Sequence, residues 1–215
     1  MDIDEFITTG FKPETKGVFS HIKGIGRNEL ALMFARLGFK RGVEVGTEGG
    51  KYANVLLKSI PELHLTCIDP WTVYDDGGGY KDVDQERYNK YYAEAVERTK
   101  GYNCDLVRGY SMNVIKDWPD ESIDFVYIDG NHRLDYVTND IVNWTDKVKK
   151  GGIVAGHDFI KLRDPHNSHV PYAVEAYAQA YFIKPVYILD NKNASRSVEL
   201  NKYYDRIRSC FFVKK

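Results

Sequence analysis

Hydrophobic and polar residues recur along this chain with two different periods. Short apolar runs bounded by turn formers predict buried strands, and apolar residues three or four positions apart predict helices that pack on them. We expect strands near residues 43–45, 64–69, 104–109, 123–128, 153–155, 186–189 and 209–213. We expect longer helices near residues 28–37, 51–60, 88–99, 134–148 and 171–182.

Strands that alternate with helices predict an α/β fold with a mostly parallel sheet and helices on both faces. The expected fold is therefore a Rossmann-like, doubly wound, seven-stranded sheet that closes with a C-terminal antiparallel β-hairpin. Residues 1–26 have weak periodicity and several turn formers, which indicates an irregular N-terminal cap. A single domain over residues 27–215 is expected to follow.

The stretch Val43-Glu44-Val45-Gly46-Thr47-Glu48-Gly49-Gly50 joins the first strand to the helix that begins at Lys51. Its glycines allow a tight turn and leave room for a ligand, while free N–H groups at the helix start favour an anionic group. The spacing is not the G-x-G-x-x-G of dinucleotide-binding turns. Glu44, two residues before Gly46, suits a cationic amine. S-adenosylmethionine carries both an amine and a carboxylate; a connection without a ligand is the alternative.

An acid also ends the second expected strand. Asp69 follows the glycine turn at the spacing from which a carboxylate reaches a ribose diol. Trp71 comes two residues later and could lie against a purine. The alternative is a capping aspartate and a core tryptophan.

The segment from Thr72 to Lys81 contains three adjacent glycines, Gly77 to Gly79, with aromatic residues on both sides. This composition suits a flap that moves over the site, and it suits a solvated loop without a role equally well.

Two further strand ends carry polar side chains that could perform chemistry. They are Asp129 and His132 after one strand, and His157 and Asp158 after the next. The two carboxylates with His157 would suit a divalent cation, with Mg²⁺ favoured by oxygen ligands. His132 could accept a proton, because imidazole titrates near neutral pH. Acids that cap helices and histidines that satisfy local backbone are the alternative.

The composition indicates which classes of partner and which compartment to expect. The chain of 215 residues has 43% hydrophobic residues and a formal net charge of -1, so no electrostatic footprint for nucleic acid is visible and a small-molecule partner is favoured. Three cysteines without disulfide or zinc spacing favour a reducing cytoplasm. The acidic start does not resemble a signal peptide, and no apolar run reaches membrane-spanning length. A homo-oligomer is left open.

Five motifs together resemble the class I S-adenosylmethionine-dependent methyltransferases. They are V-E-V-G-T-E-G-G, I-D-P-W, R-G-Y-S, F-V-Y-I-D-G-N-H and G-G-I-V-A-G-H-D, spread over roughly residues 40 to 160. The chain is similar in particular to the small-molecule O-methyltransferases, which include catechol O-methyltransferase and the sugar-modifying enzymes of antibiotic pathways. This resemblance is specific for the fold and the cofactor and loose for the substrate.

The resemblance also implies roles for individual residues. The implied cofactor-binding residues are Glu44, Gly46, Thr47, Gly49, Gly50, Asp69, Trp71, Ser111 and Asp129. In metal-dependent relatives, three ligands occupy the positions of Asp129, His157 and Asp158 here, and a histidine at the second position departs from the usual acid. His132 stands where the catechol enzyme has its lysine base.

We therefore expect an enzyme that transfers a methyl group from S-adenosylmethionine to a hydroxyl of a small molecule, such as a sugar or phenol. His132 and Asp129 are the expected catalytic residues, with Mg²⁺ assistance. The rivals are a metal-independent methyltransferase acting on protein or nucleic acid, an NAD-dependent oxidoreductase, and a non-catalytic domain that binds S-adenosylmethionine. The missing G-x-G-x-x-G counts against the oxidoreductase.

Overall fold

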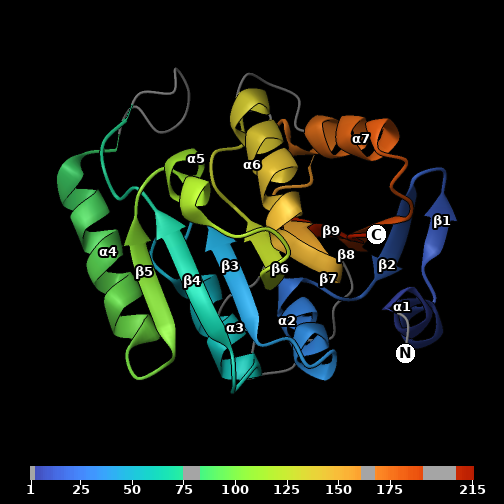
Figure 1. The fold of residues 1–215 in the computed structure, drawn as a ribbon, viewed down its shortest axis with the longest axis horizontal. Coiled ribbons are helices and arrows are strands. Elements are labelled where there is room, and N and C mark those ends of the chain that lie inside the picture. Colours follow the sequence, from blue (N-terminus) through green and yellow to red (C-terminus); the bar gives the residue numbers. More distant parts are fainter. Residues whose placement is uncertain (1–2, 75–82, 161–167, 191–206) are drawn as a thin grey trace.

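The structure, a computed structural model, describes residues 3–74, 83–160, 168–190 and 207–215. Its centre is a nine-stranded sheet in the order β1-β2-β8-β9-β7-β6-β3-β4-β5 (Figure 1). The strands are β1 (Glu14–Lys16), β2 (Phe19–Lys23), β3 (Arg41–Val45), β4 (His64–Asp69), β5 (Cys104–Arg108), β6 (Ile123–Ile128), β7 (Val148–Gly156), β8 (Val186–Asp190) and β9 (Cys210–Val213).

The middle of the sheet is parallel, from β5 through β4, β3 and β6 to β7. Strand β9 lies between β7 and β8 and runs antiparallel to both. The chain therefore closes with the predicted antiparallel pair, and β3 to β9 are the seven predicted strands. The Rossmann-like, doubly wound fold is confirmed.

Helices cover both faces of the sheet (Figure 1). The helices are α1 (Ile3–Phe11), α2 (Arg27–Arg36), α3 (Lys51–Ser59), α4 (Gln85–Thr99), α5 (Ser111–Val114) with a 3₁₀ turn (Ile115–Asp117), α6 (Leu134–Lys147) and α7 (Val170–Ala180). None of the described helices is both long and apolar enough to span a bilayer.

Side chains that alternate along the strands separate two hydrophobic cores. Phe125 and Tyr127 of β6 pack with α2 and α3, while Val126 and Ile128 pack with α6 and α7.

The N-terminal segment is more regular than predicted. The prediction of irregular backbone over residues 1–26 is wrong for its described part, which holds α1, β1 and β2. Strand β2 pairs in parallel with β8, and β1 pairs antiparallel with β2. The backbone hydrogen bonds come from a strand more than 160 residues away in the sequence, so local pattern gave little sign of them. The division into a cap and a domain stays a prediction.

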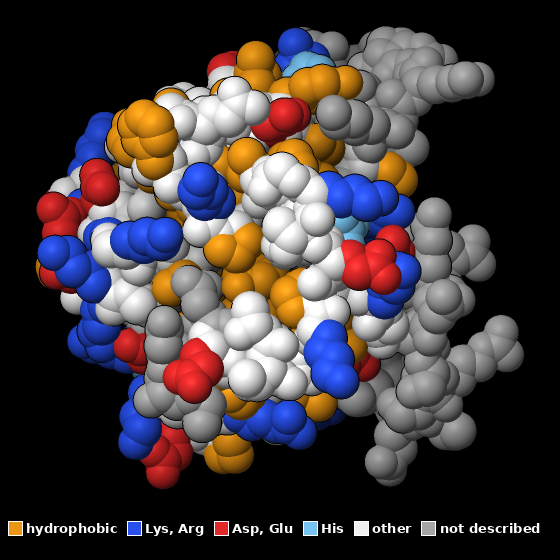
Figure 2. Space-filling view, turned by 90° about the vertical axis from the view of Figure 1, so that its right-hand side faces the viewer, with side chains coloured by type: hydrophobic (Ala, Val, Ile, Leu, Met, Phe, Trp, Pro, Cys, Tyr) orange, Lys and Arg blue, Asp and Glu red, His pale blue; other side chains and the backbone are white. Residues whose placement is uncertain are grey.

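The carboxyl ends of the parallel strands meet at one edge of the sheet, and the strand order reverses between β3 and β6. Ligands of doubly wound sheets bind at such a reversal. Figure 2 shows the molecule from the side on which β1 lies in Figure 1, and basic and acidic side chains are interspersed on that face. This agrees with the near-zero net charge.

Candidate active site

A cavity of about 900 Å³ opens at the carboxyl ends of β3, β4, β5, β6 and β7. It is the place where the fold predicts a ligand. Seven of the predicted site residues line it: Gly46, Asp69, Ser111, Asp129, His132, His157 and Asp158. Five others, Glu44, Thr47, Gly49, Gly50 and Trp71, do not line it.

The turn after β3 brings the chain very close to the end of β6. Gly46 has φ 86, and a Cβ placed on it would clash with the Asp129 carbonyl. Backbone hydrogen bonds from Gly46 N to Ile68 O (2.8 Å) and from Asp129 N to Val45 O (2.8 Å) hold this approach. Gly46 is thus required by its left-handed backbone and by the neighbouring strand end, and it leaves the main chain open to the cavity.

The other two glycines of the turn serve helix packing. A Cβ on Gly50 would lie 2.9 Å from the Cα of Ala95 in α4, and one on Gly49 would lie 2.9 Å from the Arg98 guanidinium. Arg98 also donates a hydrogen bond to the Gly49 carbonyl. These glycines let α3 and its turn approach α4, and Thr47 beside them is buried. They shape the turn without bordering the cavity.

Glu44 lies beneath the turn, inside the protein. It is 2% exposed, and the Cys67 thiol donates to its Oε2 at 3.6 Å. Burial raises the pKa of Glu44 to about 8, with a smaller contribution from the Asp129 charge. Successive residues of a strand face opposite sides, so Val45 borders the cavity while Glu44 points toward the α3 side. Glu44 therefore lies behind the turn in the protein interior and does not line the cavity in this structure.

Asp69 is fixed at the end of β4 by backbone donors. Its carboxylate accepts hydrogen bonds from Glu48 N (2.9 Å) and Trp71 N (2.8 Å). Burial raises its pKa, and these two hydrogen bonds partly offset the rise. Each oxygen still has a lone pair for a ligand hydroxyl in the cavity. The predicted position for a ribose contact is therefore available.

Trp71 is fully buried, unlike the predicted ring at the cavity wall. Its φ of 42 turns the chain inward, where the indole Nε1 donates to the Glu48 carbonyl at 2.7 Å. Its ring packs edge-on against Tyr92 at 5.0 Å. Trp71 holds the turn that carries Glu48 in place, and Pro70 lines the cavity instead.

A second wall of the cavity joins α5 and α6. Trp144 Nε1 donates to the Ser111 hydroxyl at 2.7 Å, so the predicted site residue Ser111 is anchored from α6. Asp140, one turn before Trp144, also lines the cavity, and we did not predict it. Burial raises its pKa to about 6, and hydrogen bonding from Ser111 lowers it in part. In the sequence, an acid on the otherwise apolar helix face of Val137, Ile141 and Trp144 could have indicated that Asp140 belongs to the site.

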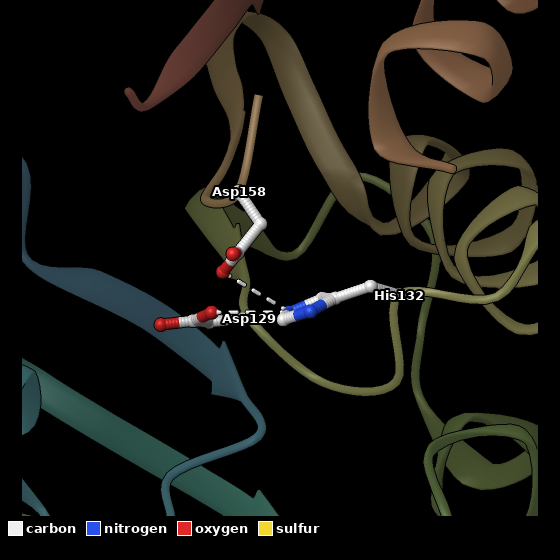
Figure 3. A group of neighbouring side chains, drawn as sticks. All are labelled: Asp129, His132 and Asp158. Carbon is white, nitrogen blue, oxygen red and sulfur yellow. Dashed lines mark ion pairs between the residues drawn. The ribbon is translucent and has the colours of Figure 1, made fainter. Parts of the chain in front are cut away.

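The ends of β6 and β7 bring four ionisable side chains together. His132 Nε2 lies 3.5 Å from Asp129 Oδ1 and 3.3 Å from Asp158 Oδ2 (Figure 3). His157 Nδ1 lies 2.8 Å from Asp158 Oδ2 and 3.4 Å from Asp129 Oδ1. The polar residues predicted at these two strand ends therefore lie close together in the structure.

The charges in this cluster stabilise one another. Burial alone would raise the pKa of Asp129, but His157 and His132 outweigh it and hold the pKa well below its ordinary range. Burial favours neutral His132, but Asp129 and Asp158 outweigh it and raise its pKa. His132 Nε2 is buried and makes no hydrogen bond of good geometry within the described residues. A buried ring nitrogen without a hydrogen bond of good geometry favours a ligand that supplies its partner.

The cluster also offers a candidate metal-binding group that differs in one residue from the predicted set, and the predicted set stays a prediction. Donor atoms of Asp129, His132 and Asp158 all lie within 4.8 Å of one another, and this group contains His132 in place of the predicted His157. The backbone of His157 continues the pairing of β7 with β6, through its N–H to Ile128 O at 3.0 Å. Its nearly buried ring lies against Asp158, so His157 is placed to orient the two carboxylates.

Sequence reasoning missed several further residues that line the cavity. Arg27 at the start of α2 places Nη1 3.3 Å from Asp129 Oδ2 and its guanidinium 5.1 Å from the Tyr52 ring centroid. Tyr88 and Tyr91 of α4 also line the cavity. The Gly77 to Gly79 loop, predicted as a flap or a solvated loop, lies outside the described residues.

The chain matches a known family and known structures. Residues 43–159, more than half of the chain, match the family described as methyltransferase domain, and the chain belongs to that family. No curated protein sequence matched. The resemblance to class I S-adenosylmethionine-dependent methyltransferases, drawn from the motifs, is thereby confirmed.

Three solved structures show the likeness of the fold. An O-methyltransferase from Bacillus cereus in complex with SAH has 14% identity and a TM-score of 0.56, over 87% of this chain and 80% of that chain. The O-methyltransferase TomG from Streptomyces achromogenes, in complex with SAM, has 15% identity and a TM-score of 0.56, over 88% and 80%. The N-methyltransferase NodS from Bradyrhizobium japonicum has 15% identity and a TM-score of 0.55, over 87% and 94%. The fold is thus shared by enzymes that methylate different atoms.

Proposed function

We propose that this protein transfers a methyl group from S-adenosylmethionine to a hydroxyl of a small molecule such as a sugar or a phenol. The observation that carries the proposal is the cavity itself. It joins a wall formed by Gly46, Asp69 and Ser111 to the acid–imidazole cluster around His132. The family supplies the reaction class.

The cofactor would occupy the half of the cavity at β3, β4 and β5. Asp69 is placed to accept hydrogen bonds from the ribose hydroxyls, and the main chain at Gly46 is open to the amino-acid end. When bound, the cofactor supplies a methyl group on a cationic sulfur. The lining acids Glu48 and Asp69 offset that positive charge.

The acceptor would occupy the half of the cavity at β6 and β7. Its hydroxyl would lie beside the imidazole of His132, which lines the cavity. The Nε2 atom makes no hydrogen bond of good geometry within the described residues and could receive the hydroxyl proton. Asp129 and Asp158 would stabilise the imidazolium that forms when His132 takes this proton. The protein mainly aligns the acceptor oxygen with the methyl carbon and the sulfur, so positioning supplies much of the acceleration.

A divalent cation fits the same cluster. Two carboxylates and an imidazole with donor atoms within 4.8 Å of one another suit a small hard cation such as Mg²⁺, and the ion would use the unsatisfied Nε2 of His132. Asp129, His132 and Asp158 would hold it. Such an ion lowers the pKa of a hydroxyl next to it. With the ion bound through His132, another group would have to receive the hydroxyl proton.

The experiment that tests the proposal is a methyl-transfer assay with purified protein, S-adenosylmethionine, and parallel panels of sugars, phenols, amines, a peptide and a nucleic acid. Each panel is run with Mg²⁺ and with a chelator, and formation of S-adenosylhomocysteine is measured. We expect product with a hydroxylated small molecule and none with peptide or nucleic acid. Transfer to an amine, a peptide or a nucleic acid alone would contradict the proposed acceptor class.

A further inference from the structure

The two loops that carry the acid–imidazole cluster are both fastened to the start of α7. Ser168 Oγ donates a hydrogen bond to the Asp158 carbonyl at 2.7 Å, and His169 N donates to the His132 carbonyl at 2.9 Å. Neither Ser168 nor His169 lines the cavity. An effect of these two residues on the chemistry is therefore transmitted through the backbone of Asp158 and His132.

The side chain of His169 makes a second contact with the loop that carries His132. Its Nδ1 accepts a hydrogen bond at 3.0 Å from Leu134 N, the first N–H of α6. Arg133, the N-cap residue of α6, makes no capping hydrogen bond with its own side chain, so His169 supplies that acceptor from another element. His169 thus holds the chain at the carbonyl of His132 and again two residues later.

The backbone at Asp158 shows that this side of the cavity needs support. Its φ of 56 lies in the left-handed region, which a residue other than glycine keeps only where its surroundings hold it. Ser168 Oγ and Ile160 N both donate to the Asp158 carbonyl, each at 2.7 Å. The Asp158 carboxylate in turn lies 3.3 Å from His132 Nε2. The start of α7 therefore fixes both partners of this pair.

We propose that His169 is a positioning residue, which sets the place of His132 in the cavity and so the rate of methyl transfer. This inference rests on the proposed function. A misplacement of about 1 Å can cost about 100-fold in rate, because the reacting groups must be aligned. The hydrogen bonds of His169 go to His132, Leu134 and the first turn of α7, so the wall at Gly46, Asp69 and Ser111 is not held by it. Cofactor affinity should therefore not depend on His169.

The test moves the hydrogen-bond acceptor at position 169. His169→Asn keeps an acceptor oxygen at the δ position, His169→Gln places it one methylene further out, and His169→Ala removes it. Turnover is measured with the hydroxylated acceptor found in the panel, at saturating concentrations, and S-adenosylhomocysteine affinity is measured by calorimetry. We expect His169→Ala and His169→Gln to lower kcat about 10- to 100-fold, with affinity within about 3-fold of the wild-type value. His169→Asn should retain both within about 3-fold.

Asp124→Ala is the control for a general loss of stability. Asp124 also accepts hydrogen bonds from backbone, from Lys40 N at 2.8 Å and Arg41 N at 2.9 Å. It lies at the start of β6, at the edge of the sheet opposite the cavity. We expect this control to unfold at a lower temperature and to keep kcat within about 3-fold. Thermal unfolding shows that each variant is folded at the assay temperature.

Three results would overturn the inference alone. They are wild-type turnover in His169→Ala, equal turnover in the Asn and Gln variants, and an equal loss of turnover in Asp124→Ala. The comparison of Asn with Gln decides if His169→Ala does not fold. A wild-type protein that transfers no methyl group to any hydroxylated acceptor would overturn the proposed function, and this inference with it.

Discussion

The two halves of the cavity are built in different ways. At β3, β4 and β5 the site is shaped by backbone: Gly46 lies against the Asp129 carbonyl, and Asp69 is held by two backbone N–H groups. At β6 and β7 the site consists of ionisable side chains whose charges stabilise one another. We therefore expect changes in the first half to act on folding and cofactor affinity, and changes in the second half to act on turnover.

The largest effect is expected at Gly46. A Gly46→Ala change adds a Cβ that clashes with the backbone of the β6 end, and it places alanine in a left-handed backbone conformation. We therefore expect the free energy of unfolding to fall by more than about 4 kcal/mol. Gly101→Ala is the matched control, since Gly101 has φ 84 and nothing within 4 Å of an added Cβ. We expect that control to lose about 1 kcal/mol. Equal losses in thermal unfolding would show that the contact with β6 is unimportant.

On the acceptor side, His132→Ala is expected to lower turnover by about 10²- to 10⁴-fold while changing cofactor affinity by less than about 3-fold. The physical reason is that the imidazole lies between Asp129 and Asp158, in the half of the cavity that we propose for the acceptor. Turnover and calorimetric affinity are measured on the same preparation.

His64→Ala is the control for His132→Ala. His64 also pairs with an acid, Asp105, at 2.7 Å, but it lies at the start of β4, away from the cavity. The control should retain wild-type turnover. If His132→Ala also retained it, His132 would be excluded as the proton acceptor.

Buried Glu44 is expected to make the folding stability depend on pH. Its pKa of about 8 in the folded protein is above the ordinary value of 4.5, so the folded state keeps a proton that the unfolded chain releases between these pH values. Folding stability should therefore fall as pH rises from about 5 to 8, by up to about 1.4 kcal/mol per pH unit from this group. Glu44→Gln removes that dependence. Identical slopes in the two proteins, from chemical unfolding at several pH values, would contradict the buried position of Glu44.

The smallest effect is expected for Asp69→Asn, which loses the charge and keeps one acceptor oxygen, so that one of the two backbone donors, Glu48 N or Trp71 N, loses its partner. We expect cofactor affinity to fall about 10-fold and turnover at saturation to stay within about 3-fold. Asp105→Asn on the exposed part of β5 is the control and should bind as the wild-type protein does. An unchanged affinity in Asp69→Asn would remove Asp69 from the proposed ribose contact.

The contrast between the halves also explains what the sequence could predict. The strand ends that carry Asp69, Asp129, His132 and Asp158 followed from local periodicity and from the rule that parallel strands end at one edge. Their convergence on one cavity was therefore predictable. The pairing of β2 with β8 was not, because it joins segments remote in the sequence.

Other misses have a similar physical origin. A glycine needed for a ligand and one needed for helix packing look the same in a sequence, and Gly50 is of the second kind because it meets Ala95. Trp71 is an aromatic residue close after the strand-end acid Asp69, which suggested a position at the cavity wall. Its left-handed backbone instead turns the side chain toward the protein interior. Arg27 reaches Asp129 from outside the segment that matches the family, so no motif pointed to it.

The central claim is that the β3–β5 half of this cavity is a binding site for S-adenosylmethionine. Calorimetric titration of the purified wild-type protein with S-adenosylmethionine, and separately with NAD⁺, tests it most directly. The account predicts a dissociation constant on the order of micromolar for S-adenosylmethionine and no measurable heat with NAD⁺. Tight binding of NAD⁺, or no binding of either ligand, would contradict it.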